Sequence, residues 1–119
     1  MAIYHITYAA DWQKAKADGE YRLSTKGRTL EQQGFIHASD LHQLIPTANF
    51  IYADDDDLLV LVIDTEKLAP GVEVKYEQLR GAHEPFPHIY GPLNADAVTD
   101  TFQLHKGDDG TFRRWRATE

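Results

Sequence analysis

The apolar run at residues 58–63 is the feature that most constrains the fold of this chain. It reads LLVLVI, without a polar side chain. A strand with one face in water alternates apolar and polar residues, so an unbroken run of this length is typical of a central strand covered on both faces. The chain must therefore place other elements against both sides of this strand. No apolar stretch is long enough to span a bilayer.

The elements expected around this run predict an α+β fold with a mostly antiparallel sheet. Alternation over residues 3–8 predicts a first strand that carries His5 and Thr7 on one face and packs its other face against a helix layer. Helices are expected in the N-terminal half, from an N-cap at Asp11 to Gly19 and from a cap at Asp40 to Tyr52. A short third helix is expected at 29–33, with Thr29 as its cap.

Later in the chain, strands follow strands. Segments 72–76, 88–90, 98–105 and 111–115 all have strand character, with a brief helix ending at residue 97 and a hairpin turn at 106–110. This order favours an antiparallel α+β fold over a doubly wound parallel one. We expect a single domain over residues 1–119.

Three local patterns give further predictions. Pro46 lies inside the helical pattern, so the helix should kink or restart there. The acidic run at residues 54–57 lacks the spaced oxygens and glycine of a calcium loop, which predicts a solvated turn. Residues 77–87 contain two prolines and are expected to form a loop.

Charge and composition limit the classes of partner. The net charge is −7, whereas general nucleic-acid binding needs clustered Lys and Arg, found here only at residues 113–116. The chain has no cysteine, which excludes disulfides and thiolate metal sites. Its start lacks the basic and apolar regions of a signal peptide. We therefore expect a cytoplasmic protein that binds a small molecule rather than membranes or nucleic acid in general.

Three expected strands each place a histidine two residues before a hydroxyl. Residues i and i+2 of a strand share a face, so each pair projects to one side. A neutral imidazole donates through one nitrogen and accepts through the other, and a neighbouring hydroxyl can fix that choice. If the strands face one cleft, they form a pocket without carboxylates that suits a polar or anionic ligand. The pairs are His5 with Thr7, His37 with Ser39, and His88 with Tyr90.

The residues alone leave other interpretations open. Each histidine can instead be a hydrogen-bonded core residue, with Ser39 merely at a helix start. Three histidines on neighbouring strands can also bind zinc with an open position, as in a hydrolase. Their separations of 32 and 51 residues neither support nor exclude this. A non-catalytic binding module is the third alternative.

Several motifs resemble the DUF952 family of small uncharacterised bacterial proteins. The similarity covers about residues 2–100 and is carried by the segments at 4–7, 19–21, 34–39 (GFIHAS), 48–52, 59–64 and 86–93 (FPHIYGPL). That family is grouped with proteins of the ADP-ribosyltransferase-like fold, which include NAD-dependent toxins, poly-ADP-ribose polymerases and RNA 2′-phosphotransferases. The resemblance therefore implies a split, ADP-ribosyltransferase-like sheet and a site for NAD or an ADP-ribose-type nucleotide.

The resemblance also implies roles for individual residues. His5 and Thr7 would hold the ribose and the nicotinamide amide of NAD. Tyr21 or Tyr90 would supply a stacking surface. His37 and Ser39, where a strand enters a helix, would make polar or phosphate contacts.

His88 lies in or near the place of the catalytic glutamate of this fold, and this is the main departure from the pattern. A histidine lacks the negative charge that stabilises an oxocarbenium-like state. On this resemblance His88 would act on the acceptor as a general base. His88 and His37 are thus the catalytic candidates of an ADP-ribosyl- or phosphotransferase-like enzyme.

Overall fold

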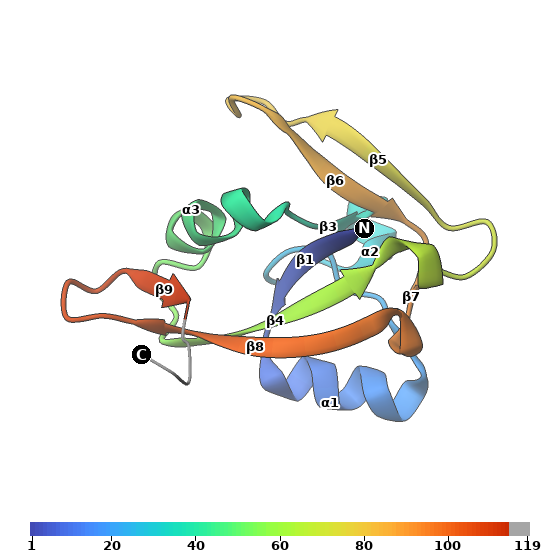
Figure 1. Ribbon diagram of the computed structural model, residues 1–119, viewed down its shortest axis with the longest axis horizontal. Helices are drawn as coiled ribbons and strands as arrows, with labels where there is room; N and C mark the ends of the chain where they lie inside the picture. Colours follow the sequence, from blue (N-terminus) through green and yellow to red (C-terminus); the bar gives the residue numbers. More distant parts are fainter. Residues whose placement is uncertain (115–119) are drawn as a thin grey trace.

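The computed structural model describes residues 1–114, and its centre is a four-stranded antiparallel sheet (Figure 1). The strands lie in the order β1 (Ala2–Thr7), β4 (Asp57–Asp64), β8 (Val98–Lys106) and β9 (Phe112–Arg114). Strand β4 contains the apolar run and pairs with β1 on one side and β8 on the other. Leu58 and Val60 belong to one core cluster, whereas Leu61 and Ile63 belong to another. The prediction of a central strand covered on both faces is confirmed.

The remaining strands form two smaller antiparallel sheets. One has the order β3 (Ile36–His37), β6 (Pro85–Tyr90) and β5 (Glu73–Gln78), and the other pairs β2 (Glu20–Tyr21) with β7 (Leu93–Asn94). Two hydrogen bonds between the main chains of Tyr4 and Ser39, of 2.8 and 2.7 Å, tie the end of β3 to the edge of β1. The α+β class with antiparallel sheets is confirmed.

Helices cover the two faces of the large sheet. Helix α1 (Ala9–Asp18) buries Trp12 and Ala15 in the cluster that contains Ile3, and α3 (Leu41–Ile51) packs Leu44 in the cluster that contains Ile6. Because side chains alternate along β1, His5 and Thr7 share the face of Ile3. Short helices α2 (Leu30–Gln33), η1 (Thr65–Lys67) and η2 (Ala95–Ala97) complete the connections. None of the described helices is long and apolar enough to cross a membrane.

The cap predicted for the first helix is wrong. Helix α1 begins at Ala9, after Tyr8, whose carbonyl accepts from the Trp12 amide at 3.1 Å. Asp11 lies in the first turn instead, where a carboxylate interacts favourably with the helix dipole. The predicted stop at Gly19 is confirmed. Its φ of 85° is left-handed, and its N–H donates to the Ala15 carbonyl.

The predicted caps of the other two helices are confirmed. Gln32 N–H donates to Thr29 Oγ1 at 3.2 Å, and Thr29 N–H donates back to Gln32 Oε1. Asp40 N–H donates to Gln43 Oε1 at 2.8 Å at the start of α3. Pro46 lies within α3, which continues through it as one helix.

Most differences between the predicted and the observed elements lie at the ends of strands. The loop expected at 77–87 is shorter, because β5 and β6 pair from Glu73 with Tyr90 to Gln78 with Pro85. Strands β2 and β7 are not foreseen, since two-residue strands carry no periodic signal. The acidic run is exposed except at Asp55, which accepts from Tyr8 and Lys26. Trp115, expected to end the closing strand, lies outside the described residues.

Candidate functional site

Three buried side chains on the α1 side of the sheet form a hydrogen-bonded chain. The hydroxyl oxygen of Tyr21 lies 2.8 Å from His5 Nε2 and 2.8 Å from Thr7 Oγ1. Pairing of β2 with β7 holds Tyr21 in this position. His5 Nδ1 lies 2.5 Å from the main-chain carbonyl oxygen of His37. A carbonyl only accepts, so in a neutral ring Nδ1 carries the proton, and Nε2 accepts from Tyr21 while Thr7 donates to Tyr21.

Burial keeps the side chains of this hydrogen-bonded chain uncharged at neutral pH. It lowers the pKa of His5 to about 4, although the hydrogen bond with the His37 carbonyl opposes the shift. Burial also raises the pKa of Tyr21. The site therefore presents neutral donors and acceptors, which suit hydroxyl and amide groups of a ligand.

The side chain of His37 lies among other rings. Its ring centroid is 5.3 Å from that of Phe86 and 5.4 Å from that of His88. Burial, followed by repulsion from His88 and His5, lowers the pKa of His37 to about 4. The Nε2 atoms of His37 and His88 are buried and have no hydrogen-bond partner among the described residues. Such orphaned atoms are uncommon and point to a water or to a functional role.

A carboxylate that the sequence did not single out orients His88. His88 Nδ1 lies 2.8 Å from Glu77 Oε1 on β5, and the Tyr90 hydroxyl donates to the same oxygen. These two hydrogen bonds lower the pKa of Glu77. Phe35 stacks on the His88 ring with a centroid distance of 3.9 Å. Because the carboxylate accepts, Nδ1 of a neutral His88 holds the proton and Nε2 keeps its lone pair, the state that a general base requires.

The sequence prediction misses Glu77 because it places residues 77–87 in a loop. The one available signal was the alternation of residues 72–76, which Glu77 extends by one position. Alternation fixes the face of a side chain but not its partner on the next strand, so the pair with His88 needs the sheet register.

Thr7 and Tyr21, two members of the hydrogen-bonded chain, line a cavity of about 250 Å³. Its wall is rich in hydroxyl groups and contains one acid and two basic residues. The lining residues are Ile6, Thr7, Tyr8, Asp11, Tyr21, Leu23, Ser24, Thr25, Lys26, Gly27, Arg28, Thr29 and Tyr52. The expectation of a pocket without carboxylates is wrong here, because Asp11 belongs to the lining.

A hollow of about 10 Å³, the size of one water, lies beside this cavity. His5, His37 and Ser39 all line it, and it shares Ser24 and Tyr52 with the larger cavity. Two of the three expected histidine strands therefore meet at one place.

The turn of residues 25–28 forms the basic part of the cavity. Arg28 N–H donates to the Thr25 carbonyl at 2.7 Å, and Gly27 has a φ of 74°, a left-handed value that favours glycine. Lys26 Nζ lies 3.0 Å from Asp55 Oδ2. Arg28 is exposed and has no acidic partner within residues 1–114.

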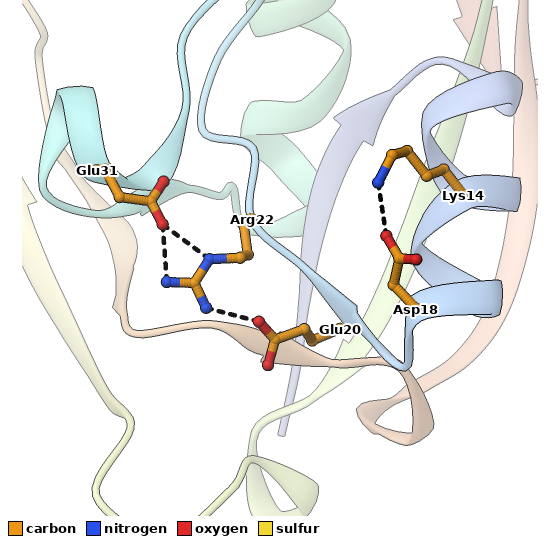
Figure 2. A network of polar contacts seen from close by, with 5 residues as sticks. All are labelled: Lys14, Asp18, Glu20, Arg22 and Glu31. Carbon is orange, nitrogen blue, oxygen red and sulfur yellow. Dashed lines mark hydrogen bonds and ion pairs between the residues drawn. The ribbon is translucent and has the colours of Figure 1, made fainter.

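A second, larger hollow of about 490 Å³ adjoins the first, and Asp11, Tyr21 and Leu23 line both. Figure 2 shows its ion pairs. Arg22 Nη1 lies 2.6 Å from Glu20 Oε2, and Arg22 Nη2 lies 2.7 Å from Glu31 Oε1. Lys14 Nζ lies 2.6 Å from Oδ2 of Asp18, which is one helical turn further along α1. The cations of this hollow are therefore already neutralised.

The predicted site residues fall into two groups. Thr7 and Tyr21 line the main cavity, with His5 behind them, and His37 and Ser39 line the adjoining hollow. His88 and Tyr90 lie on the β5–β6 side with Glu77 and are not part of either cavity lining.

The start of α3, where phosphate contacts were expected, already holds a carboxylate. Tyr76 donates to Asp40 Oδ1 at 2.8 Å. The Asp40 carboxylate would repel a second anion at this helix end, so the basic turn of residues 25–28 is the better place for a phosphate.

The arrangement does not favour the zinc alternative. No group of three or more His, Asp or Glu side chains within residues 1–114 is placed to hold a metal ion. Both ring nitrogens of His5 are engaged in hydrogen bonds.

Comparisons with known proteins agree with the fold. The crystal structure of protein CC0527 from Caulobacter crescentus is 33% identical and covers 95% of this chain and 94% of its own, with a TM-score of 0.79. The crystal structure of a double mutant of that protein gives the same values. No curated protein matches the chain. A family model described as a protein of unknown function, DUF952, matches residues 6–101. The chain therefore belongs to the DUF952 family.

Proposed function

We propose that this domain binds a nucleotide of the NAD or ADP-ribose type in the cavity beside Thr7 and Tyr21, in the manner of an ADP-ribosyltransferase-like protein. The observation that carries the proposal is the chain from Thr7 through Tyr21 to a neutral His5. It places uncharged hydrogen-bonding groups in the wall of a cavity that also contains Arg28, which has no acidic partner within residues 1–114. Ribose hydroxyls and an amide fit the first part, and phosphates fit the second.

The size of the site supports a ligand of this class. Cavities for small molecules usually measure about 300–1,000 Å³. The cavity and the adjoining hollow, of about 250 and 490 Å³, together fall in that range. Ser39 and His37 lie behind the cavity and would contact the ligand through the small hollow.

The pair of Glu77 and His88 has the arrangement of a general base and its orienting carboxylate, and we propose a transfer reaction as a second step. Because Nε2 of His88 is buried and His88 is outside both cavity linings, this step requires the β5–β6 side to open toward the ligand. On this proposal the glycosidic bond of NAD breaks, and nicotinamide leaves with the bonding electrons. The acceptor oxygen attacks the ribose carbon, and its proton passes to His88 Nε2. Glu77 then stabilises the imidazolium through Nδ1–H. His37, whose ring lies beside that of His88, is the other group that would meet the acceptor, and Tyr90 holds Glu77 in place.

Binding is tested by calorimetric titration with NAD and with ADP-ribose. Thr7→Val removes the hydroxyl but keeps the shape of the side chain, so the affinity should fall about tenfold if one hydrogen bond to the ligand is lost. Thr99→Val, on the exposed part of β8, is the matched control. The same samples are assayed for release of nicotinamide, which His88→Asn should abolish without loss of binding.

The outcomes separate the hypotheses. Binding without nicotinamide release supports a non-catalytic binding module. An absence of heat with either ligand at millimolar concentration refutes the nucleotide proposal altogether.

A further inference from the structure

The cavity and its adjoining hollow share Asp11, Tyr21 and Leu23 in their linings, and we call the two together the groove. Charge is distributed unevenly over them. At the turn of residues 25–28, Asp55 neutralises Lys26 across 3.0 Å. Arg28 lines the same cavity, and no acid pairs with it in the part of the chain described. The other described cations without an acidic partner, such as Arg80, do not line these cavities. This end of the groove therefore retains one positive charge.

The opposite end is negative. Asp11 lies at the junction, lines both hollows and has no cationic partner among residues 1–114. Beyond it, the ion pairs of Figure 2 set three carboxylates against two cations, Lys14 and Arg22. The charged side chains that line this hollow are three carboxylates, Asp11, Asp18 and Glu20, and two cations, Lys14 and Arg22, so one negative charge is in excess.

We infer that Arg28 and Asp11 orient the ligand and select one that carries an anion at one end and a cation at the other. This inference rests on the proposed nucleotide site. Pyrophosphate lies against Arg28, because a guanidinium donates two parallel hydrogen bonds to phosphate oxygens. The nicotinamide ring lies toward Asp11 and the acidic hollow.

The orientation has a consequence for the redox state of the ligand. The nicotinamide ring is a cation in NAD⁺ and neutral in NADH, whereas the two pyrophosphates are identical. Only the contact with Asp11 and the acidic hollow therefore distinguishes the two forms. An exposed ion pair is worth at most about 1 kcal/mol, which corresponds to about a fivefold preference for NAD⁺.

The test is a calorimetric comparison of NAD⁺, NADH and ADP-ribose at low ionic strength. Wild-type protein should bind NAD⁺ more tightly than NADH, by up to about fivefold. Asp11→Asn keeps the shape of the side chain and should remove that preference while leaving the affinity for ADP-ribose nearly unchanged. Arg28→Gln should weaken all three ligands by similar factors and reduce the dependence on salt. Asp108→Asn and Arg80→Gln change exposed charges outside the groove and serve as matched controls.

Two results would overturn the inference while the proposed site stands. One is equal affinity for NAD⁺ and NADH in the wild type. The other is an Asp11→Asn protein that loses affinity for NAD⁺, NADH and ADP-ribose alike. If none of the three ligands binds, the proposed function itself fails, and the inference fails with it.

Discussion

Acidification between pH 7 and pH 5 should destabilise this domain through two buried histidines. His5 and His37 both have a pKa lowered from 6.5 to about 4, first by burial. The unfolded chain therefore binds more protons than the folded one between pH 6.5 and pH 4. Stability rises with pH across this window and is lost as the pH falls through it.

The magnitude follows from the two pKa values. For one histidine, linkage between an unfolded pKa of 6.5 and a folded pKa of about 4 gives a loss of about 2 kcal/mol at pH 5. The pair would then cost a large part of the 5–15 kcal/mol that is usual for a domain. Glu77 and Glu84 have lowered pKa values, so the stabilisation that they provide is lost on acidification only below the ordinary carboxyl pKa of 4.5. The window above pH 5 thus isolates the histidines.

Urea denaturation at several pH values between 7 and 5 measures the effect. His37→Leu is the informative variant, because Nε2 of His37 makes no hydrogen bond with any described residue that the substitution would break. It should remove about half of the pH dependence. His83→Asn, at an exposed loop position, should leave the dependence unchanged. A wild-type stability that stays constant between pH 7 and pH 5 would refute the reasoning.

Two further predictions concern single side chains. Tyr21→Phe removes the hydroxyl between His5 and Thr7 and leaves the buried Nε2 of His5 without a donor, so unfolding experiments at pH 7 should show a loss of about 2 kcal/mol; an unchanged stability would mean that water replaces the hydroxyl. Gly34→Ala forces a side chain onto a φ of 93°, with no atom within 4 Å of the new Cβ, so conformation alone should cost about 1–2 kcal/mol, and a neutral result in thermal denaturation would contradict a left-handed Gly34.

Local sequence signals predicted the elements better than their ends. The caps Thr29 and Asp40 and the stop at Gly19 were found because each acts on amides or carbonyls of the adjacent turn. Asp11 was misplaced as a cap because an acid in the first turn and an acid at the cap give similar sequence patterns. The extension of β6 back to Pro85 could not be predicted, since it depends on pairing with β5.

The candidate site was likewise predicted only where a local sequence pattern applies. The alternation of β1 placed His5 and Thr7 on one face, and the structure has them there, joined by Tyr21. The role of Tyr21 in that chain was not predicted, because β2 is too short to show a period. Nothing in the sequence assigned Arg28 or Asp11 to a binding site, since a charged residue in a turn or a helix is ordinary unless its surroundings are known.

The sequence by itself determined the central strand, the antiparallel α+β class and the faces on which the histidines lie. These properties follow from hydrophobic period and from capping, which act over a few residues. Only the tertiary structure decided which polar groups meet. The contacts of His5 with Tyr21, of His88 with Glu77 and of Lys26 with Asp55 span 16, 11 and 29 residues. Such partners are fixed by strand register and by the packing of separate elements, and no local pattern encodes them.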